Sequence, residues 1–160
     1  FMIAYNRSLS LLDDYDHQSF ELPNGSKDVY RIEYSECLDI VKRSKFTGKN
    51  DNFGKERDKS FDSSISTIYQ TYDGKELYPT LEQKAAMLLY LVTKNHSFID
   101  GNKRIASTVF LYFLDRNKSL FVDGRKRISD ETLATLTILI AASNPKDKDI
   151  IINLILAILN

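Results

Sequence analysis

Cysteine is almost absent from the 160-residue sequence, and neither charge is in excess. The single residue of this type, Cys37, cannot form an internal disulfide, which excludes a disulfide scaffold and fits a reducing compartment. We expect it to be a small apolar core residue on a helix. Lys plus Arg and Asp plus Glu each total 22, so no whole-chain field attracts nucleic acid or an anionic membrane.

Long hydrophobic runs are also missing. The start, FMIAYNRSLSLL, lacks the basic region, apolar core and cleavage site of a signal peptide. The apolar tail 150–159 is too short to span a bilayer and is interrupted by Asn153. We therefore expect a soluble, cytoplasmic protein with no membrane partner. The length fits one compact domain, but because the sequence opens with Phe1 rather than Met, an upstream domain stays open.

The first half of the sequence predicts short helices between polar loops. Two polar stretches, 22–28 and 46–59, are expected to be loops. Between them, the pattern predicts an amphipathic helix from an N-cap at Ser35 to about Lys45. A second helix is expected over 61–68.

A tight hairpin is predicted next, in IYQTYDGKELYP. Asp73-Gly74 is a dipeptide that two-residue hairpin turns prefer, because both central positions need positive φ. Thr80, followed three residues later by Gln83, has the spacing of a helix capping box. The helix that follows should run to about Lys94.

The second half predicts three further helices. One covers 104–117 and is apolar nearly all round, which is typical of a central helix. Another starts near Ser129 or Asp130 and ends before Asn144. The last starts at about Asp147, and the residues expected to face inward are Ile151, Leu154, Ile155 and Ile158. The predicted fold is mainly α, a helical bundle with one small β-hairpin.

The loop His96 to Arg104, HSFIDGNKR, connects two of these helices and holds the most reactive residue types. Gly101 and Asn102 tolerate left-handed or turn conformations, and they precede a helix start whose first amides lack intrahelical partners. Such a turn is suited to bind phosphate, and Arg104 in the first helical turn adds a cation.

The other loop residues fit the same chemistry. Asp100 beside a phosphate is suited to hold Mg²⁺, and His96 is suited to accept a proton at neutral pH. Phe98 should point into the core and anchor the loop. Singly, each has a plainer explanation, since a histidine at a helix end is usually a cap and Asp-Gly-Asn is usually a turn. Their combination in nine residues favours a functional site.

This loop resembles the H-x-F-x-[DE]-G-N-x-R signature of the Fic/Doc (Fido) family, and the preceding hairpin is similar to the family's flap. The resemblance implies a Fic-type helical bundle that uses ATP and Mg²⁺ to modify a Ser, Thr or Tyr hydroxyl on a target protein. It implies His96 as general base, Asp100 as metal ligand, and, as nucleotide ligands, Gly101, Asn102, Lys103 and Arg104. It also implies target positioning by strand addition along the flap residues Thr71, Tyr72, Asp73, Gly74 and Lys75.

The resemblance covers roughly 61–160, which we take as the catalytic core, with 1–60 as a helical and loop extension. The phrases NHSFIDGNKRIA and LYPTLEQKAA are also similar to Fic domains at the end of RhuM-type virulence-associated proteins. That similarity implies a domain upstream of Phe1, which is where any nucleic-acid binding would lie.

Two positions depart from the G-N-G-R-x-x-R pattern of family members that transfer AMP. Lys103 stands in place of a glycine and Ser107 in place of the second arginine. The lysine form resembles Doc, the toxin branch, in which the nucleotide is reversed and its γ-phosphate faces the acceptor. This favours phosphoryl transfer, with AMP transfer (AMPylation) as the alternative. A Doc-like role further implies a target in the translation machinery and an inhibitory, antitoxin-like partner.

Two other classes of function fit the sequence less well. A non-catalytic nucleotide-binding or interaction module would need neither His96 nor Asp100, so their presence argues against it. A metal-dependent hydrolase is weaker still, because the one other histidine is His17, far along the chain. Fic proteins often carry an inhibitory [ST]-x-x-x-E-[GN] motif, and no glutamate of this sequence has that context. Restraint is therefore expected from a partner or from sequence outside the chain.

Overall fold

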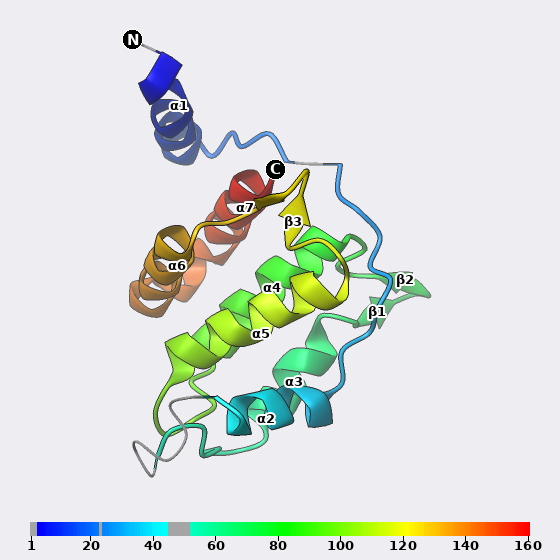
Figure 1. Cartoon of the computed structure of the whole chain (residues 1–160). Helices are drawn as coiled ribbons and strands as arrows, with labels where there is room; N and C mark the ends of the chain where they lie inside the picture. Colours follow the sequence, from blue (N-terminus) through cyan, green and yellow to red (C-terminus); the bar gives the residue numbers. More distant parts are fainter. Residues whose placement is uncertain (1–2, 23, 45–51) are drawn as a thin grey trace.

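The computed structural model describes residues 3–22, 24–44 and 52–160, and it is mainly helical (Figure 1). The helices are α1 (Ile3–His17), α2 (Tyr34–Lys42), α3 (Ser60–Thr67), α4 (Leu81–Lys94), α5 (Asn102–Arg116), α6 (Asp130–Ala142), the short 3-10 helix η1 (Pro145–Asp147) and α7 (Lys148–Leu159). Two antiparallel hairpins, β1 (Thr71–Tyr72) with β2 (Lys75–Glu76) and β3 (Phe121–Val122) with β4 (Arg125–Lys126), complete the described fold.

The centre of the molecule is the pair α4 and α5, which lie side by side in Figure 1. Helix α4 also packs against α3, α6 and α7, while α5 packs against α2 and α6. Both helices therefore bury apolar side chains on several sides, and Leu88, Leu89, Phe110 and Phe113 are fully buried. The expectation of a central helix after the loop is confirmed.

Thr80 and Ser129, the predicted capping residues, are the N-caps of α4 and α6. Thr80 Oγ1 accepts from the Gln83 amide at 3.1 Å, and the Thr80 amide donates to Gln83 Oε1 at 3.1 Å. Ser129 Oγ accepts from the Thr132 amide at 3.1 Å, so α6 starts at Asp130 as expected. The bonds from the Gln83 and Thr132 amides satisfy first-turn amides that would otherwise lack partners.

The predicted hairpin is present, but the expectation of a single hairpin was wrong. Asp73 and Gly74 have φ of 53° and 76°, as the two-residue turn requires. The same geometry recurs at Asp123 and Gly124, with φ of 52° and 76°. The second turn joins β3 and β4. Its Asp-Gly dipeptide is the sequence pattern from which this hairpin could have been predicted.

Two helix details also differ from the sequence-based expectation. The N-cap of α2 is Glu33 rather than Ser35, because the Glu33 amide donates to Glu36 Oε1 at 2.6 Å. The helix ends at Lys42, and the predicted end at Lys45 lies outside the described residues. On α7, Ile151 and Ile155 are buried as expected, but Leu154 and Ile158 are half-buried because they border a shallow groove beside α6.

The N-terminal part of the chain is tied to the core. Asn117 Oδ1 accepts from the amides of Val29 and Tyr30, both at 2.8 Å, and Lys84 Nζ bonds Asp28 Oδ1 at 2.9 Å. Cys37 is fully buried, as expected, and burial raises the pKa of its thiol to about 12. None of the helices in the described ranges is both long and apolar enough to cross a membrane.

Candidate active site

The loop between α4 and α5 has two turns with positive φ. His96, two residues past the end of α4, has φ of 51°, and Gly101, the N-cap of α5, has φ of 92°. The first hydrogen bond of α5 runs from the Ile105 amide to the Gly101 carbonyl at 2.8 Å. The amides of the preceding residues therefore point out of the helix start toward the loop, as an anion site requires.

Asn102 closes the loop from within. Its side-chain Oδ1 accepts from the Phe98 amide at 2.9 Å, and its Nδ2 donates to the Phe98 carbonyl at 2.8 Å. Phe98 itself is fully buried, as expected, and its ring contacts Phe61 edge-on at 4.9 Å between centroids. Because both side-chain atoms of Asn102 are used here, its predicted part in nucleotide binding falls to its main-chain amide.

A second segment, residues 53–57, lies along the loop and was not predicted to do so. Three main-chain hydrogen bonds join the two, from the Arg57 amide to Ser97 O (2.8 Å), from the Ile99 amide to Lys55 O (2.9 Å) and from the Gly54 amide to Asp100 O (3.2 Å). The available signal was weak: an aromatic residue, Phe53, followed by Gly54 inside a polar stretch.

This segment is itself held by the helices beneath it. The Tyr34 hydroxyl of α2 donates to Glu56 Oε1 at 2.7 Å, and this bond, with burial, raises the pKa of Tyr34 to about 12. On the α3 side, the Ser60 and Ser97 hydroxyls are hydrogen-bonded at 2.6 Å. The loop is thus fixed from both sides, which reduces the reorganisation that catalysis would demand.

Arg57 reaches from this segment onto His96. Its Nη1 lies 3.0 Å from His96 Nδ1 and donates to the His96 carbonyl at 3.1 Å. Both side chains are exposed to solvent. The predicted base is therefore accessible, and one of its ring nitrogens already has a cationic neighbour.

The start of α5 carries an unusual set of charges. Its first turn has no acidic residue and instead contains Lys103 and Arg104. Of the six other α-helices that the structure describes, α1 has no acidic first-turn residue either, and five have one, namely Glu36 in α2, Asp62 in α3, Glu82 in α4, Asp130 and Glu131 in α6 and Asp149 in α7. Cations at a helix N-terminus are unfavourable because the helix dipole is positive there. An anion bound at this point would relieve that cost.

Asp100 stands beside these cations. Arg104 Nη2 donates to Asp100 Oδ2 at 3.3 Å, and the Arg104 guanidinium lies over the Phe53 ring at 4.8 Å from its centroid. The described residues hold no group of three His, Cys, Asp or Glu side chains able to bind a metal by themselves. An Mg²⁺ ion at Asp100 would therefore take its other ligands from phosphate oxygens and water, which is its usual preference.

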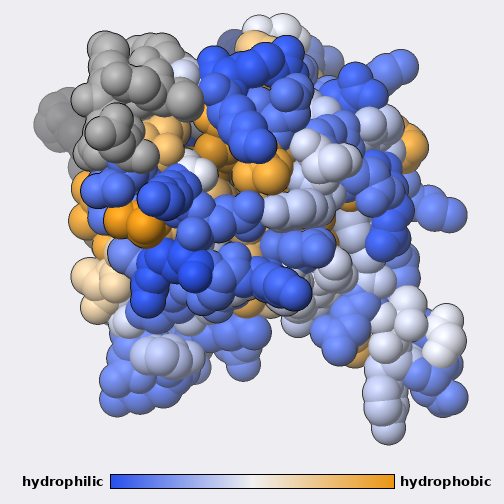
Figure 2. Space-filling view, turned by 90° about the horizontal axis from the view of Figure 1, so that it is seen from below, coloured by the Kyte–Doolittle hydropathy of each residue, from blue (hydrophilic) through white to orange (hydrophobic). Residues whose placement is uncertain are grey.

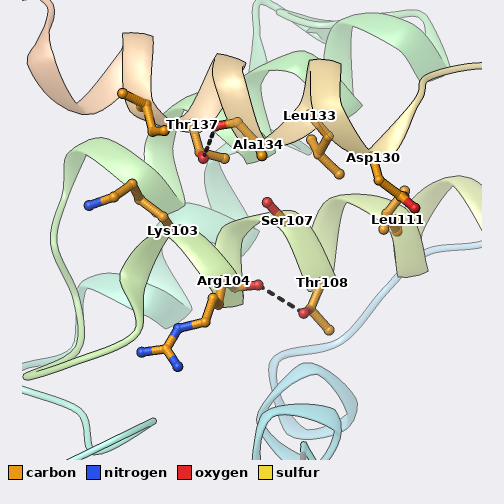
Figure 3. A pocket seen from close by; sticks show the side chains of 10 residues that line it. Lys103, Arg104, Ser107, Thr108, Leu111, Asp130, Leu133, Ala134 and Thr137 are labelled. Atoms are coloured by element: carbon orange, nitrogen blue, oxygen red, sulfur yellow. Dashed lines mark hydrogen bonds between the residues drawn. The ribbon is translucent and has the colours of Figure 1, made fainter. Parts of the chain in front are cut away.

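A groove of about 400 Å³ extends from this point between α5 and α6 (Figure 3). In Figure 3, Lys103 and Ser107 lie on the side of α5 that faces α6, whereas the Arg104 side chain points away from α6. The groove walls are mostly apolar and include Leu111, Leu133 and Ala134. Ser107, one helical turn after Lys103, therefore lines this groove. The end of the molecule seen in Figure 2 is largely hydrophilic.

The structure does not bring the hairpin β1–β2 to the loop. The hairpin precedes α4 and the loop follows it, and the 14 residues of α4 span about 21 Å. Residues Thr71 to Lys75 are exposed at the far end of the helix. A role for them in target positioning would require a target that reaches both ends of α4. The extended backbone next to the loop belongs to residues 53–57 instead.

The sequence is similar to a protein family and to a characterised relative. The model of the Fic/DOC family matches residues 32–114, more than half of the chain, and so starts well before the expected core boundary at residue 61. Over 56 residues the chain is 39% identical to Toxin Doc of Mycolicibacterium smegmatis (strain ATCC 700084 / mc(2)155). That match covers 35% of this chain and 43% of the relative's length. No solved structure matches significantly.

Proposed function

The chain belongs to the Fic/DOC family, and from this premise we propose that it transfers a phosphate-containing group from Mg-ATP to a hydroxyl of a target protein. The observation that carries the proposal is the loop itself. In nine residues it joins an exposed histidine, a half-buried carboxylate and a helix start with two cations and no acid. A phosphate-binding module alone would need only the last of these.

Each residue has a definite part in this proposal. His96 accepts the proton of the target hydroxyl, and Asp100 holds the metal. The amides that follow Gly101 and the side chains of Lys103 and Arg104 bind the phosphates. Bound Mg-ATP supplies the group that is transferred. The apolar groove between α5 and α6 adjoins Lys103 and offers room for the rest of the nucleotide.

Phosphoryl transfer is the reaction that we favour, with AMP transfer as the alternative. Lys103 and Ser107 replace the glycine and arginine of the AMP-transferring pattern, and both line the groove. Without a guanidinium at Ser107, the phosphates have one forked donor fewer on that side. The similarity to a Doc toxin supports the same choice. It also supports a cytoplasmic toxin–antitoxin context, with a target in the translation machinery and an inhibitory partner.

The test is transfer of label from ATP labelled at the α- or at the γ-phosphate, in a cell lysate and then with the identified target. We expect the γ-label on the target. Transfer of the α-label would replace phosphoryl transfer by AMP transfer. The variant His96→Ala should lose about 10²- to 10⁴-fold in rate while keeping nucleotide binding. His17→Ala, which removes the other, distant histidine, is the matched control. Absence of both labels would contradict the proposed function.

The metal role of Asp100 has its own test. Asp100→Ala should remove the dependence of nucleotide binding on Mg²⁺, because no second carboxylate lies within the loop. Titration of Mg²⁺ at fixed ATP measures this. Asp115, exposed near the end of α5 and about three helical turns beyond the loop, provides the control substitution Asp115→Ala. An unchanged Mg²⁺ dependence in Asp100→Ala would remove Asp100 from the metal site.

A further inference from the structure

Arg57 has a contact that bears on how the site works. A guanidinium has only donors, so His96 Nδ1, 3.0 Å from Arg57 Nη1, must be the acceptor. The neutral imidazole then carries its proton on Nε2. The lone pair that would accept a proton from a hydroxyl is therefore covered by Arg57 in this state of the protein.

The other histidine has the opposite arrangement. His17 Nδ1 lies 2.8 Å from the main-chain carbonyl of Asp13, which can only accept a hydrogen bond, so here Nδ1 carries the proton. The structure thus assigns opposite tautomers to the two histidines of the sequence. His17 therefore serves as a reference, within the same protein, for a measurement of the tautomer of His96.

The position of Arg57 limits where its side chain can go. Its main-chain amide is fixed to Ser97 O at 2.8 Å, so the guanidinium stays beside the loop when it leaves His96. The neighbouring carboxylate, Asp58, already accepts from the Ser60 amide at 2.9 Å. Among the described residues, the guanidinium contacts given by the structure both involve His96. The charge of Arg57 also acts on Asp58, but its hydrogen bonds go to uncharged acceptors, which a bound anion could replace.

We propose that Arg57 is a further phosphate-binding residue of the site, which covers His96 Nδ1 in the free protein and releases it when nucleotide phosphate binds. The proposal rests on the proposed function, because a base must lie close to the phosphate that its hydroxyl attacks. A guanidinium binds phosphate with two charge-assisted hydrogen bonds, against one bond to a neutral imidazole. Binding of the nucleotide therefore exposes the base at the moment it is needed.

The experiment combines nucleotide binding with nitrogen NMR of the two histidines. In the free protein at mildly alkaline pH, we expect the proton on Nε2 of His96 and on Nδ1 of His17. Saturating Mg-ATP should shift the Nδ1 resonance of His96 and leave that of His17 in place. Arg57→Ala should shift the same His96 resonance without nucleotide.

Affinity gives the second readout. Arg57→Ala should weaken Mg-ATP binding about tenfold or more, as expected for a lost charged hydrogen bond, and leave adenosine binding unchanged. Arg57→Lys should recover part of the loss. Lys59→Ala, which removes a second exposed cation two residues away, is the matched control and should have a much smaller effect. Thermal melts of each variant show whether it is folded, and Arg57→Lys serves if Arg57→Ala is not.

The outcomes separate the two proposals. If the wild type binds Mg-ATP and modifies its target but Arg57→Ala binds equally well, the role of Arg57 is overturned and the proposed function stands. An unshifted His96 resonance in saturating Mg-ATP would also overturn it. If the wild type does not bind Mg-ATP, the proposed function fails and the exchange of Arg57 fails with it.

Discussion

Gly101 meets two requirements that a residue with a side chain cannot meet together. Its φ of 92° lies in the left-handed region, and a Cβ at this position would lie 2.4 Å and 2.5 Å from two atoms of the Phe53 ring. We expect Gly101→Ala to lower the free energy of unfolding by about 2 to 4 kcal/mol, the sum of backbone strain and ring displacement. Urea unfolding measures the loss, and nucleotide titration measures the damage to the helix start.

Gly74 provides the matched control for this prediction. Its φ of 76° is similar, but a Cβ there meets nothing within 4 Å. Gly74→Ala should therefore cost only the backbone term, about 1 to 2 kcal/mol. If both variants lose the same stability, the contact with Phe53 has no energetic weight. The double variant Gly101→Ala with Phe53→Ala should lose less than the sum of its single changes, because one removes the obstacle for the other.

The helices after residue 60 could be predicted because their signals are local. The Thr80 and Ser129 caps and the apolar periodicity of α4 and α5 depend on residues a few positions apart. The candidate loop was predictable for the same reason, since its residues are consecutive. The pairing of residues 53–57 with the loop was not, because it joins segments about forty positions apart through main-chain atoms that any sequence offers. Arg57 was missed with it.

For the hairpin β1–β2, the sequence predicted the secondary structure correctly but could not predict where the hairpin lies relative to the loop. Its Asp73-Gly74 turn was correctly predicted, but α4 separates it from the loop. We expect Tyr72→Ala, which removes a side chain that is 76% exposed, to leave Mg-ATP affinity unchanged. Its effect, if the target contacts the hairpin, should be confined to the KM for the target. Isothermal titration and steady-state kinetics separate the two, and a loss of Mg-ATP affinity would contradict the geometry.

At the scale of the whole molecule, buried charges join the N-terminal part of the chain to the core. Lys84 is fully buried and pairs with Asp28 at 2.9 Å and with Glu76 of β2 at 3.1 Å. Glu82, two residues before Lys84 in α4, accepts from both the amide and the hydroxyl of Ser26 at 2.8 Å. Ser26 and Asp28, which precede α2, are therefore fixed to the same folded unit as α4.

Glu82 makes this connection dependent on pH. Burial raises the pKa of its carboxyl group, but the hydrogen bonds from Ser26 and the charge of Arg127 outweigh burial and hold the pKa below the ordinary value of 4.5. A group whose pKa is lowered by folding contributes stability that is present above its unfolded pKa and is lost as the pH falls through the folded value. The contribution of Glu82 is therefore complete at neutral pH and is lost on acidification, as the pH falls below the ordinary value of 4.5 and through the lower pKa of the folded protein.

The variant Glu82→Gln tests this dependence. At neutral pH it should lower the free energy of unfolding by about 1 to 3 kcal/mol, because a neutral amide replaces a buried acceptor of charge-assisted hydrogen bonds. As the pH falls through the lowered pKa of Glu82, the wild-type carboxyl becomes protonated, so the difference between the two proteins should shrink. Urea unfolding at several pH values measures it, with Glu131→Gln, an exposed glutamate of α6, as control for the loss of a surface charge. A difference that stays constant down to pH 3 would mean that the charge of Glu82 does not stabilise the link to Ser26.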